Sequence, residues 1–204
     1  MPAPEEIVAG LSAIAQRAFP IAVVFHVLLA LCAAAWLAGL RPRPRTIAIL
    51  LSVPIASVAA IAFWFKNPFN GGIFAVLALV LLLLARRSVV RSERIPASSL
   101  PLRALGVVLV LFALVYPHFL HDRSPLAYLY GAPLALIPCP TLGFATGIAL
   151  TGIARADRAW SALLASASIC YALFGVLRLG VTLDLVLFAG AIGLLVLPWR
   201  ERPR

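Results

Sequence analysis

The chain has 204 residues, of which 63% are hydrophobic and 12% are charged, and its mean hydropathy is +1.06. Soluble domains carry about 25% charged residues, so this composition excludes an ordinary soluble protein and predicts a polytopic membrane protein. The net charge of +10 comes from 16 Arg and one Lys against seven acids. Because these cations lie mainly between apolar segments, they indicate membrane topology, and we expect no nucleic-acid partner.

The first 18 residues predict a short amphipathic helix before the first span. Ile7, Leu11 and Ile14 fall on one helical face, with polar residues elsewhere. We therefore expect residues 1–18 to form an interfacial segment on the lipid bilayer. The first charged residues are Glu5 and Glu6 rather than bases, which is not typical of a cleavable signal, so we expect the first span to be retained.

Residues 19–199 predict one all-α domain, a transmembrane helix bundle of about seven spans. Apolar runs of about 20 residues recur along this region, and each can cross roughly 30 Å of hydrocarbon at 1.5 Å per residue. Residues 200–204 then form a basic tail. The expected spans are Phe19 to Leu40, Thr46 to Phe65, Phe69 to Ala85, Ala104 to Leu120, an interrupted region from Leu126 to Ala154, Ala159 to Leu177, and Val181 to Trp199.

The basic residues between these spans predict which side each connection faces. When alternate connections are assigned to the cytoplasm, one side holds thirteen cations and the other holds four. Cytoplasmic loops are rich in Lys and Arg, so we expect the N-terminus outside, the C-terminus in the cytoplasm, and a multi-pass protein of the cell inner membrane. The cytoplasmic set is Arg41, Arg43, Arg45, Arg86, Arg87, Arg91, Arg94, Arg103, Arg155, Arg158, Arg200, Arg202 and Arg204, and the outer set is Arg17, Lys66, Arg123 and Arg178.

The fifth span contains the sequence IPCPT at residues 137–141, and we expect the span to be broken there. Pro138 and Pro140 cannot donate backbone hydrogen bonds, and each disfavours helical geometry in the residue before it. The simplest interpretation is a helix with Cys139 as its N-cap and Pro140 at its first position, running on through 141–154. Residues 141–154 cover only about 21 Å. The preceding residues must therefore complete the crossing as a distorted segment, buried in protein or lining a wet cavity, as in many transporter binding sites.

The inner half of the same helix predicts close helix packing. Gly143, Gly147 and Thr151 recur every four residues and leave a smooth groove on one face. We expect a neighbouring helix to approach closely at this groove.

Asp184, one turn into the seventh span, is the first candidate for a binding site. Burying an ionisable group in the bilayer costs roughly 2.5 to 3.5 kcal/mol even on permissive scales, so such a group indicates function by default. The alternative is an interfacial residue paired with Arg178.

Cys139 is the second candidate. At a helix N-terminus the macrodipole favours a thiolate, which would make Cys139 a better metal ligand and nucleophile, although a buried inert cysteine fits equally well. The candidate ligand-binding residues on the outer side are Cys139, Thr141, Asp184, Tyr116 and Asn67.

Two histidines suggest a metal site at the end of the fourth span. His118 and His121 are three positions apart, so on a helical turn they share a face and could reach one ion. Together with Cys139 they offer imidazole and thiolate groups, which suit soft metal ions. The alternative is a solvated connection beside Asp122 and Arg123. The sequence identifies no cofactor.

Four stretches carry a family resemblance: FKNPFNGGIF after the second span, VYPHFL in the fourth, PCPTLGFATGIAL in the fifth and LGVTLDLVL in the seventh. In this order the chain resembles a bacterial multi-pass membrane family catalogued only as a domain of unknown function. The similarity covers most of the chain, and Pro-Cys-Pro-Thr is its most specific part. The resemblance implies no activity, but it marks the matching positions Asn67, Pro68, Tyr116, Pro117, Pro138, Cys139, Pro140, Thr141 and Asp184.

Two functions fit these features best. The leading hypothesis is transport or binding of a small solute or a soft metal ion in the outer half of the bundle, around the break at Cys139. The alternative is a non-catalytic accessory or structural subunit, in which the glycine groove binds a membrane protein partner or a second copy of the chain. An enzyme ranks third, because Cys139 could act as a nucleophile with a histidine base but no second acid/base motif implies a reaction.

Overall fold

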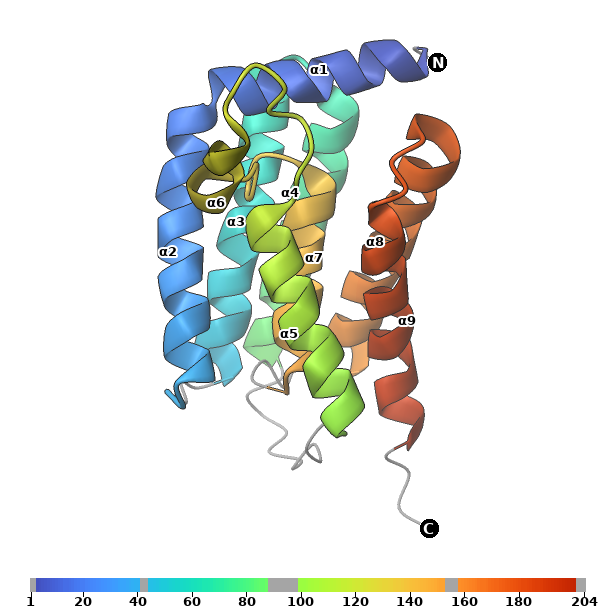
Figure 1. The fold of residues 1–204 in the computed structure, drawn as a ribbon. Coiled ribbons are helices and arrows are strands. Elements are labelled where there is room, and N and C mark those ends of the chain that lie inside the picture. The colour runs from blue at the N-terminus through green and yellow to red at the C-terminus, as the bar shows by residue number, and fades with distance from the viewer. Residues whose placement is uncertain (1–2, 41–43, 88–98, 153–157, 201–204) are drawn as a thin grey trace.

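The computed structural model describes residues 3–40, 44–87, 99–152 and 158–200, and within these residues the chain is all-helical, with no strand. Figure 1 shows a bundle of helices with one helix lying across its end. The helices are α1 (Pro4–Arg17), α2 (Phe19–Leu37), α3 (Pro44–Trp64), α4 (Pro68–Arg87), α5 (Leu100–Val115), α6 (Tyr128–Gly131), α7 (Pro138–Leu150), α8 (Arg158–Leu179) and α9 (Asp184–Arg200), and a short 3-10 helix, η2 (Pro125–Ala127), precedes α6.

The helices α2 to α5 and α7 to α9 run along the bundle, and α1 crosses one end of it (Figure 1). We call this end the α1 end. The helix α6, the α3–α4 turn and the α8–α9 turn also lie there, while α9 finishes at the opposite end. Successive bundle helices therefore turn at alternating ends.

Four of the described helices are long and apolar enough to cross a membrane, and three shorter ones are also apolar. Their outward faces carry large apolar side chains: Leu31, Val76 and Val108 are 63%, 62% and 54% exposed. Because helices that are apolar all round belong inside a membrane or a large protein core, these faces agree with the composition. The long segments are Phe19–Leu37, Thr46–Trp64, Pro68–Arg86 and Arg158–Leu179, and the shorter ones are Leu100–Val115, Pro138–Leu150 and Asp184–Val196.

The helix α1 packs against the bundle through the face that the sequence marks as apolar. Leu11 and Ile14 are both buried. Glu5 and Glu6 lie in the first turn and Arg17 in the last, so the side-chain charges complement the helix macrodipole. The helix itself is present as expected, and its position in a membrane interface stays a prediction.

The helix α7 lies at the centre of the bundle. It packs against α3, α5, α8 and α9, and every residue from Pro138 to Leu150 is buried except Cys139, which is half-buried. A Cβ atom added at Gly147 would lie 2.7 Å from the carbonyl oxygen of Gly106 on α5. Backbones can approach this closely only where side chains are absent. The close approach expected from the glycine spacing is confirmed, and the neighbouring helix is α5 of the same chain.

The helix α7 begins two residues earlier than the sequence predicted. Its N-cap is Ile137, with extended φ and ψ of −121° and 143°, and Pro138 is its first residue. The assignment of Cys139 as N-cap and Pro140 as first residue is therefore wrong. The N–H groups of the first turn have no intrahelical acceptor, so prolines at the first and third positions remove no helical hydrogen bond. From Pro138 the helix extends only about 20 Å.

Residues 132–137, between α6 and α7, are non-helical and buried. Local hydrogen bonds satisfy part of their backbone, for example from Leu134 N–H to the Ala132 carbonyl at 2.6 Å and from Ile137 N–H to the Pro133 carbonyl at 3.2 Å. The sequence predicted a distorted segment here, which a membrane tolerates only if protein surrounds it or it lines a wet cavity. The burial of residues 132–137 agrees with that reasoning. Its part in a membrane crossing stays a prediction.

The other predicted spans end within five residues of the corresponding helices. Part of the predicted basic side lies outside the described residues: this holds for 41–43, 88–98 and 153–157 and for most of the basic tail 200–204. Three cations of that side lie where the structure describes the side chains, and all three are exposed: Arg86, Arg103 and Arg158.

Candidate functional site

Tyr116 and Asp184, two of the predicted site residues, meet directly at the α1 end. Tyr116 follows the last residue of α5, and Asp184 is the first residue of α9. The Tyr116 hydroxyl donates a hydrogen bond to Asp184 Oδ1 at 2.8 Å. The two residues are 1% and 2% exposed. The carboxyl therefore lies inside the bundle rather than at an open interfacial position.

Cys139 joins this pair from the first turn of α7. Its thiol interacts with the Asp184 carboxyl, and its Sγ lies 4.0 Å from the backbone carbonyl oxygen of Tyr171 on α8. Groups from α5, α7, α8 and α9 thus converge. Three of the five predicted ligand-binding residues, Tyr116, Cys139 and Asp184, are brought together.

Two glycines of the α8–α9 hairpin make this arrangement possible. Gly175 on α8 lies so close to Asp184 that a Cβ atom at position 175 would collide with the carboxyl oxygen Oδ2. Gly180 has a φ of +70°, a left-handed conformation that glycine adopts readily, and it lets the chain reverse before α9. A side chain at position 175 would therefore push the Asp184 carboxyl away from its present position.

Tyr171 extends the site toward α4, and sequence reasoning did not identify it. Its hydroxyl donates a hydrogen bond to Asn70 Oδ1 at 2.9 Å, and its ring packs edge-on against Phe74 with the centroids 5.2 Å apart. The only signal in the sequence was a phenol hydroxyl inside an apolar span. We call the following five residues the polar cluster: Asn70, Tyr116, Cys139, Tyr171 and Asp184.

Asn67 has a structural role beside the polar cluster. It directly precedes Pro68, the first residue of α4, and its Oδ1 accepts a hydrogen bond from the N–H of Asn70 at 3.2 Å. This is N-cap geometry, with proline at the favoured first helical position. The Asn-Pro pair therefore starts a helix, and the Asn67 side chain serves that helix in this structure.

Thr141 holds the non-helical segment before α7 in place. Its hydroxyl donates a hydrogen bond to the Ile137 carbonyl oxygen at 2.7 Å and accepts one from the Ala135 N–H at 2.9 Å. Ala135 has a left-handed φ of 63°, which is unusual for a residue with a side chain. The hydroxyl proton of Thr141 is thus committed to the backbone, so Thr141 positions the start of α7 instead of facing a ligand.

The predicted metal set of His118, His121 and Cys139 is not assembled. The two histidine rings lie in the connection after α5, with centroids 5.6 Å apart, and His121 is exposed. This connection folds over the α1 end, where Arg123 lies 3.8 Å from the centre of the Phe19 ring, while Cys139 faces the polar cluster. Among the residues that the structure describes, no three His, Cys, Asp or Glu side chains are grouped to hold a metal ion.

The polar cluster combines a carboxyl, a thiol, two phenols and an amide between four bundle helices and the end of α5. In their anionic forms the carboxyl and the thiol attract a cation, and sulfur favours soft metal ions. The Tyr171 carbonyl oxygen beside the thiol offers a further ligand atom. The arrangement therefore suits a small cation held by Cys139 and Asp184.

Comparison of the chain with known protein families, curated proteins and solved structures finds no match. The resemblance to a bacterial membrane family therefore stays a prediction. Two of the motifs that carry it have local roles, because Asn-Pro starts α4 and Pro-Cys-Pro-Thr starts α7. The function has to be inferred from the polar cluster.

Proposed function

We propose that the chain is a seven-span protein of a bacterial inner membrane, with its N-terminus outside and its C-terminus in the cytoplasm. The alternating ends of the bundle helices support this count, with α6, residues 132–137 and α7 together forming a broken fifth span (Figure 1). Arg86, Arg103 and Arg158 are exposed, and they belong to the side on which the positive-inside rule expects cations.

In this proposal the protein binds a small cation, either a soft metal ion or a small organic cation, at the polar cluster and moves it across the membrane. The observation that carries the proposal is the buried 2.8 Å hydrogen bond between Tyr116 and Asp184, beside the Cys139 thiol. A carboxyl is costly to bury in a membrane bundle, and those that are retained usually bind or relay a solute.

The burial of Asp184 supports a gated site. The residue is only 2% exposed, so a solute reaches the carboxyl only after the helices around it move apart. The non-helical segment before α7 offers a place for such movement, since discontinuous helices commonly surround the solute sites of transporters.

A second polar contact continues from the cluster between α7 and α8. Thr146 Oγ1 and Ser168 Oγ lie 3.0 Å apart, and both residues are buried. Thr146 follows Cys139 by about two helical turns, or about 10 Å, so both side chains lie on the side of α7 that faces α8. A solute moving from the cluster toward the opposite end would meet these hydroxyls next.

Thermal unfolding of the purified protein in mild detergent tests the proposal, with Ag⁺, Cd²⁺, Zn²⁺ and choline as probes. A ligand present at 100 times its Kd stabilises by about 2.7 kcal/mol, which is a shift of several degrees in Tm. We expect at least one probe to raise the wild-type Tm, and Asp184→Asn to lose that increase. Cys139→Ser should lose the response to Ag⁺ and Cd²⁺, whereas Cys170→Ser, which removes an exposed thiol on α8, should keep it.

Two results would contradict this site. Either no probe shifts the wild-type Tm, or Asp184→Asn and Cys139→Ser respond as the wild type does. Flux measurements on liposomes that contain the protein then separate transport from binding, because a thermal shift without flux above that of empty liposomes limits the function to binding.

An accessory or structural subunit is the second candidate. Its support in the sequence was the glycine groove of α7, and in this structure α5 occupies the groove at Gly147. The outward apolar faces still offer a surface to lipid, to a membrane protein partner or to a second copy of the chain. Stoichiometric co-purification of a larger complex, together with no response to any probe, would favour this candidate.

A further inference from the structure

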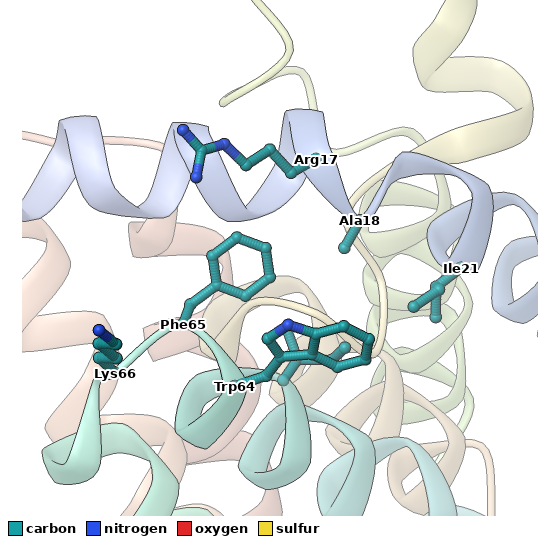
Figure 2. A pocket seen from close by; sticks show the side chains of 7 residues that line it. Arg17, Ala18, Ile21, Trp64, Phe65 and Lys66 are labelled. Atoms are coloured by element: carbon teal, nitrogen blue, oxygen red, sulfur yellow. The ribbon is translucent and has the colours of Figure 1, made fainter.

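A groove separate from the polar cluster opens at the α1 end, where the junction of α1 and α2 lies beside the end of α3. Its volume is about 560 Å³. Figure 2 shows Arg17 on α1 above the groove and Lys66 at the end of α3 below it, with aromatic side chains between them. The apolar part of the lining includes Ile21, Ile61, Trp64 and Phe65.

The two cations of this groove are available to a ligand. Arg17 and Lys66 are both exposed, and neither side chain forms an ion pair or a hydrogen bond with another residue in the described part of the chain. No acidic residue lines the groove. Two positive charges beside an apolar and aromatic lining are complementary to a molecule that is anionic at one end and apolar at the other.

Lys66 occupies a backbone position that is most often glycine. Its φ is +58°, and in the same turn the Asn67 N–H bonds to the Ala62 carbonyl oxygen at 2.8 Å. Helices commonly end in this way, with a left-handed residue that is usually glycine. A side chain in this conformation is unfavourable, and departures from local preference concentrate at functional positions.

Exposed aromatic residues lie at the same end of the bundle as the groove. Trp64 is 76% exposed, and Phe63 and Phe69, on the two sides of the α3–α4 turn, are 52% and 65% exposed. Trp is enriched where a membrane meets water, and Lys and Arg reach from that level to the lipid headgroups. The amphipathic α1 crosses the bundle at the same end (Figure 1).

We propose that this groove binds the headgroup phosphate of an anionic phospholipid. Arg17 and Lys66 contact the phosphate, and the apolar lining packs against the glycerol and the first part of the acyl chains. A lipid held in this way links α1 to α3 and so fixes α1 against the bundle. The proposal depends on the membrane placement given above and is independent of any solute at the polar cluster.

Native mass spectrometry of the purified full-length protein in mild detergent measures this binding. The probes are phosphatidylglycerol as the anionic lipid, phosphatidylcholine as the zwitterionic control, and inorganic phosphate as an anion without lipid. A cation near a membrane surface contributes about fivefold to the binding of an anionic lipid. We expect phosphatidylglycerol to bind more tightly than phosphatidylcholine, Arg17→Gln and Lys66→Gly each to weaken its binding about fivefold, and the double variant about 25-fold.

The test variant Lys66→Gly and the control variant Arg103→Gln make the result specific. Lys66→Gly removes the charge and also relieves the left-handed backbone, so its Tm without lipid should equal or exceed that of the wild type. This variant keeps the test decisive even if Arg17→Gln folds poorly. Arg103→Gln removes an exposed cation on α5 that does not line the groove, and it should bind phosphatidylglycerol as the wild type does.

Three outcomes would overturn the proposal. These are equal binding of the two lipids by the wild type, unchanged phosphatidylglycerol binding in Lys66→Gly, and binding of inorganic phosphate as tight as that of phosphatidylglycerol, which would indicate a free-anion site. Asp184→Asn tests the lipid site and the solute site independently of each other. It should leave phosphatidylglycerol binding unchanged while it abolishes the response to cations.

Discussion

Replacing Gly147 by alanine should destabilise the protein, whereas the same replacement at Gly143, one turn earlier on α7, should stabilise it. A Cβ atom at position 147 would lie 2.7 Å from the Gly106 carbonyl oxygen and 2.9 Å from the Val110 backbone nitrogen. Both atoms belong to the α5 backbone, so no side-chain rotation relieves the clash. At position 143 the nearest neighbour of the new atom would be Ala113 Cβ at 3.7 Å, which is ordinary contact.

The structure also sets the size of this difference. Ordinary contact begins at 3.4 Å, so α5 and α7 must separate by about 0.5 to 0.7 Å to accept an alanine at position 147, and overpacking of this kind typically costs about 1–3 kcal/mol. Replacing a glycine inside a helix by alanine stabilises the helix by about 0.5–1 kcal/mol. We therefore expect Gly147→Ala to lose up to about 2.5 kcal/mol and Gly143→Ala to gain about 0.5–1 kcal/mol.

Thermal unfolding of both variants in the same detergent measures this prediction. For a chain of this length, the expected difference of about 1–3 kcal/mol between the two variants corresponds to Tm values about 2–12 °C apart, with Gly143→Ala the higher. Gly106→Ala serves as a second arm, because its Cβ would lie 2.6 Å from the Gly147 carbonyl oxygen and should be destabilising too. Equal Tm values for Gly143→Ala and Gly147→Ala would refute the close backbone contact between α5 and α7.

Three further predictions concern the hydrogen bonds at the α1 end, and thermal unfolding checks each of them. Tyr116→Phe should lower stability by about 1–2 kcal/mol, because the Asp184 carboxyl loses a donor. The same change made in an Asp184→Ala background should cost little, and equal losses in the two backgrounds would show that the bond is not formed. Thr141→Val keeps the shape of the side chain but leaves a buried backbone N–H without its acceptor, so we expect a loss of about 1–3 kcal/mol that Thr141→Ser largely restores. If Thr141→Val unfolds at the wild-type temperature, the hydroxyl does not hold the start of α7. Asn67→Ala should cost about 1 kcal/mol as a lost N-cap, whereas Asn67→Asp should be tolerated, and an equal loss in both would point to a role for the amide other than capping.

The general form of the protein follows from the amino-acid sequence. In a membrane each backbone N–H and carbonyl needs an internal partner, so apolar runs of this length predict helices and exclude isolated strands. The helix boundaries were predictable within a few residues for the same reason. The spacing of Gly143 and Gly147 also predicted a close helix contact, because only small residues let two backbones approach.

The start of α7 could be predicted only approximately. Two prolines require a helix end near Cys139, but either Ile137 or Cys139 satisfies that requirement as N-cap. The choice depends on local side-chain hydrogen bonds that the proline pattern does not reveal, since the Thr141 hydroxyl donates to the Ile137 carbonyl oxygen and accepts from the Ala135 N–H. With those bonds formed, both prolines fit inside the first turn.

The membership of the polar cluster depended on the tertiary structure. Tyr116 and Asp184 are 68 positions apart, and they meet because the end of α5 and the start of α9 lie at the same end of the bundle. Tyr171 could not be selected from the sequence, because α8 is apolar on most faces and its pattern does not show which face turns inward. His118, His121 and Cys139 are not grouped in the part of the chain that the structure describes, because the connection that carries the histidines folds over the α1 end while Cys139 faces the polar cluster.

The sequence by itself determined that this chain forms apolar helices, where they run, and that a carboxyl, a thiol and a phenol occur near the same end of their spans. Those properties depend on local hydrogen bonding and on the distribution of charge along the chain. Only the tertiary structure decided which of these groups touch, because a contact between helices depends on their mutual rotation. That rotation is set by close packing at positions such as Gly147 and Gly175, where a single added carbon would separate the helices.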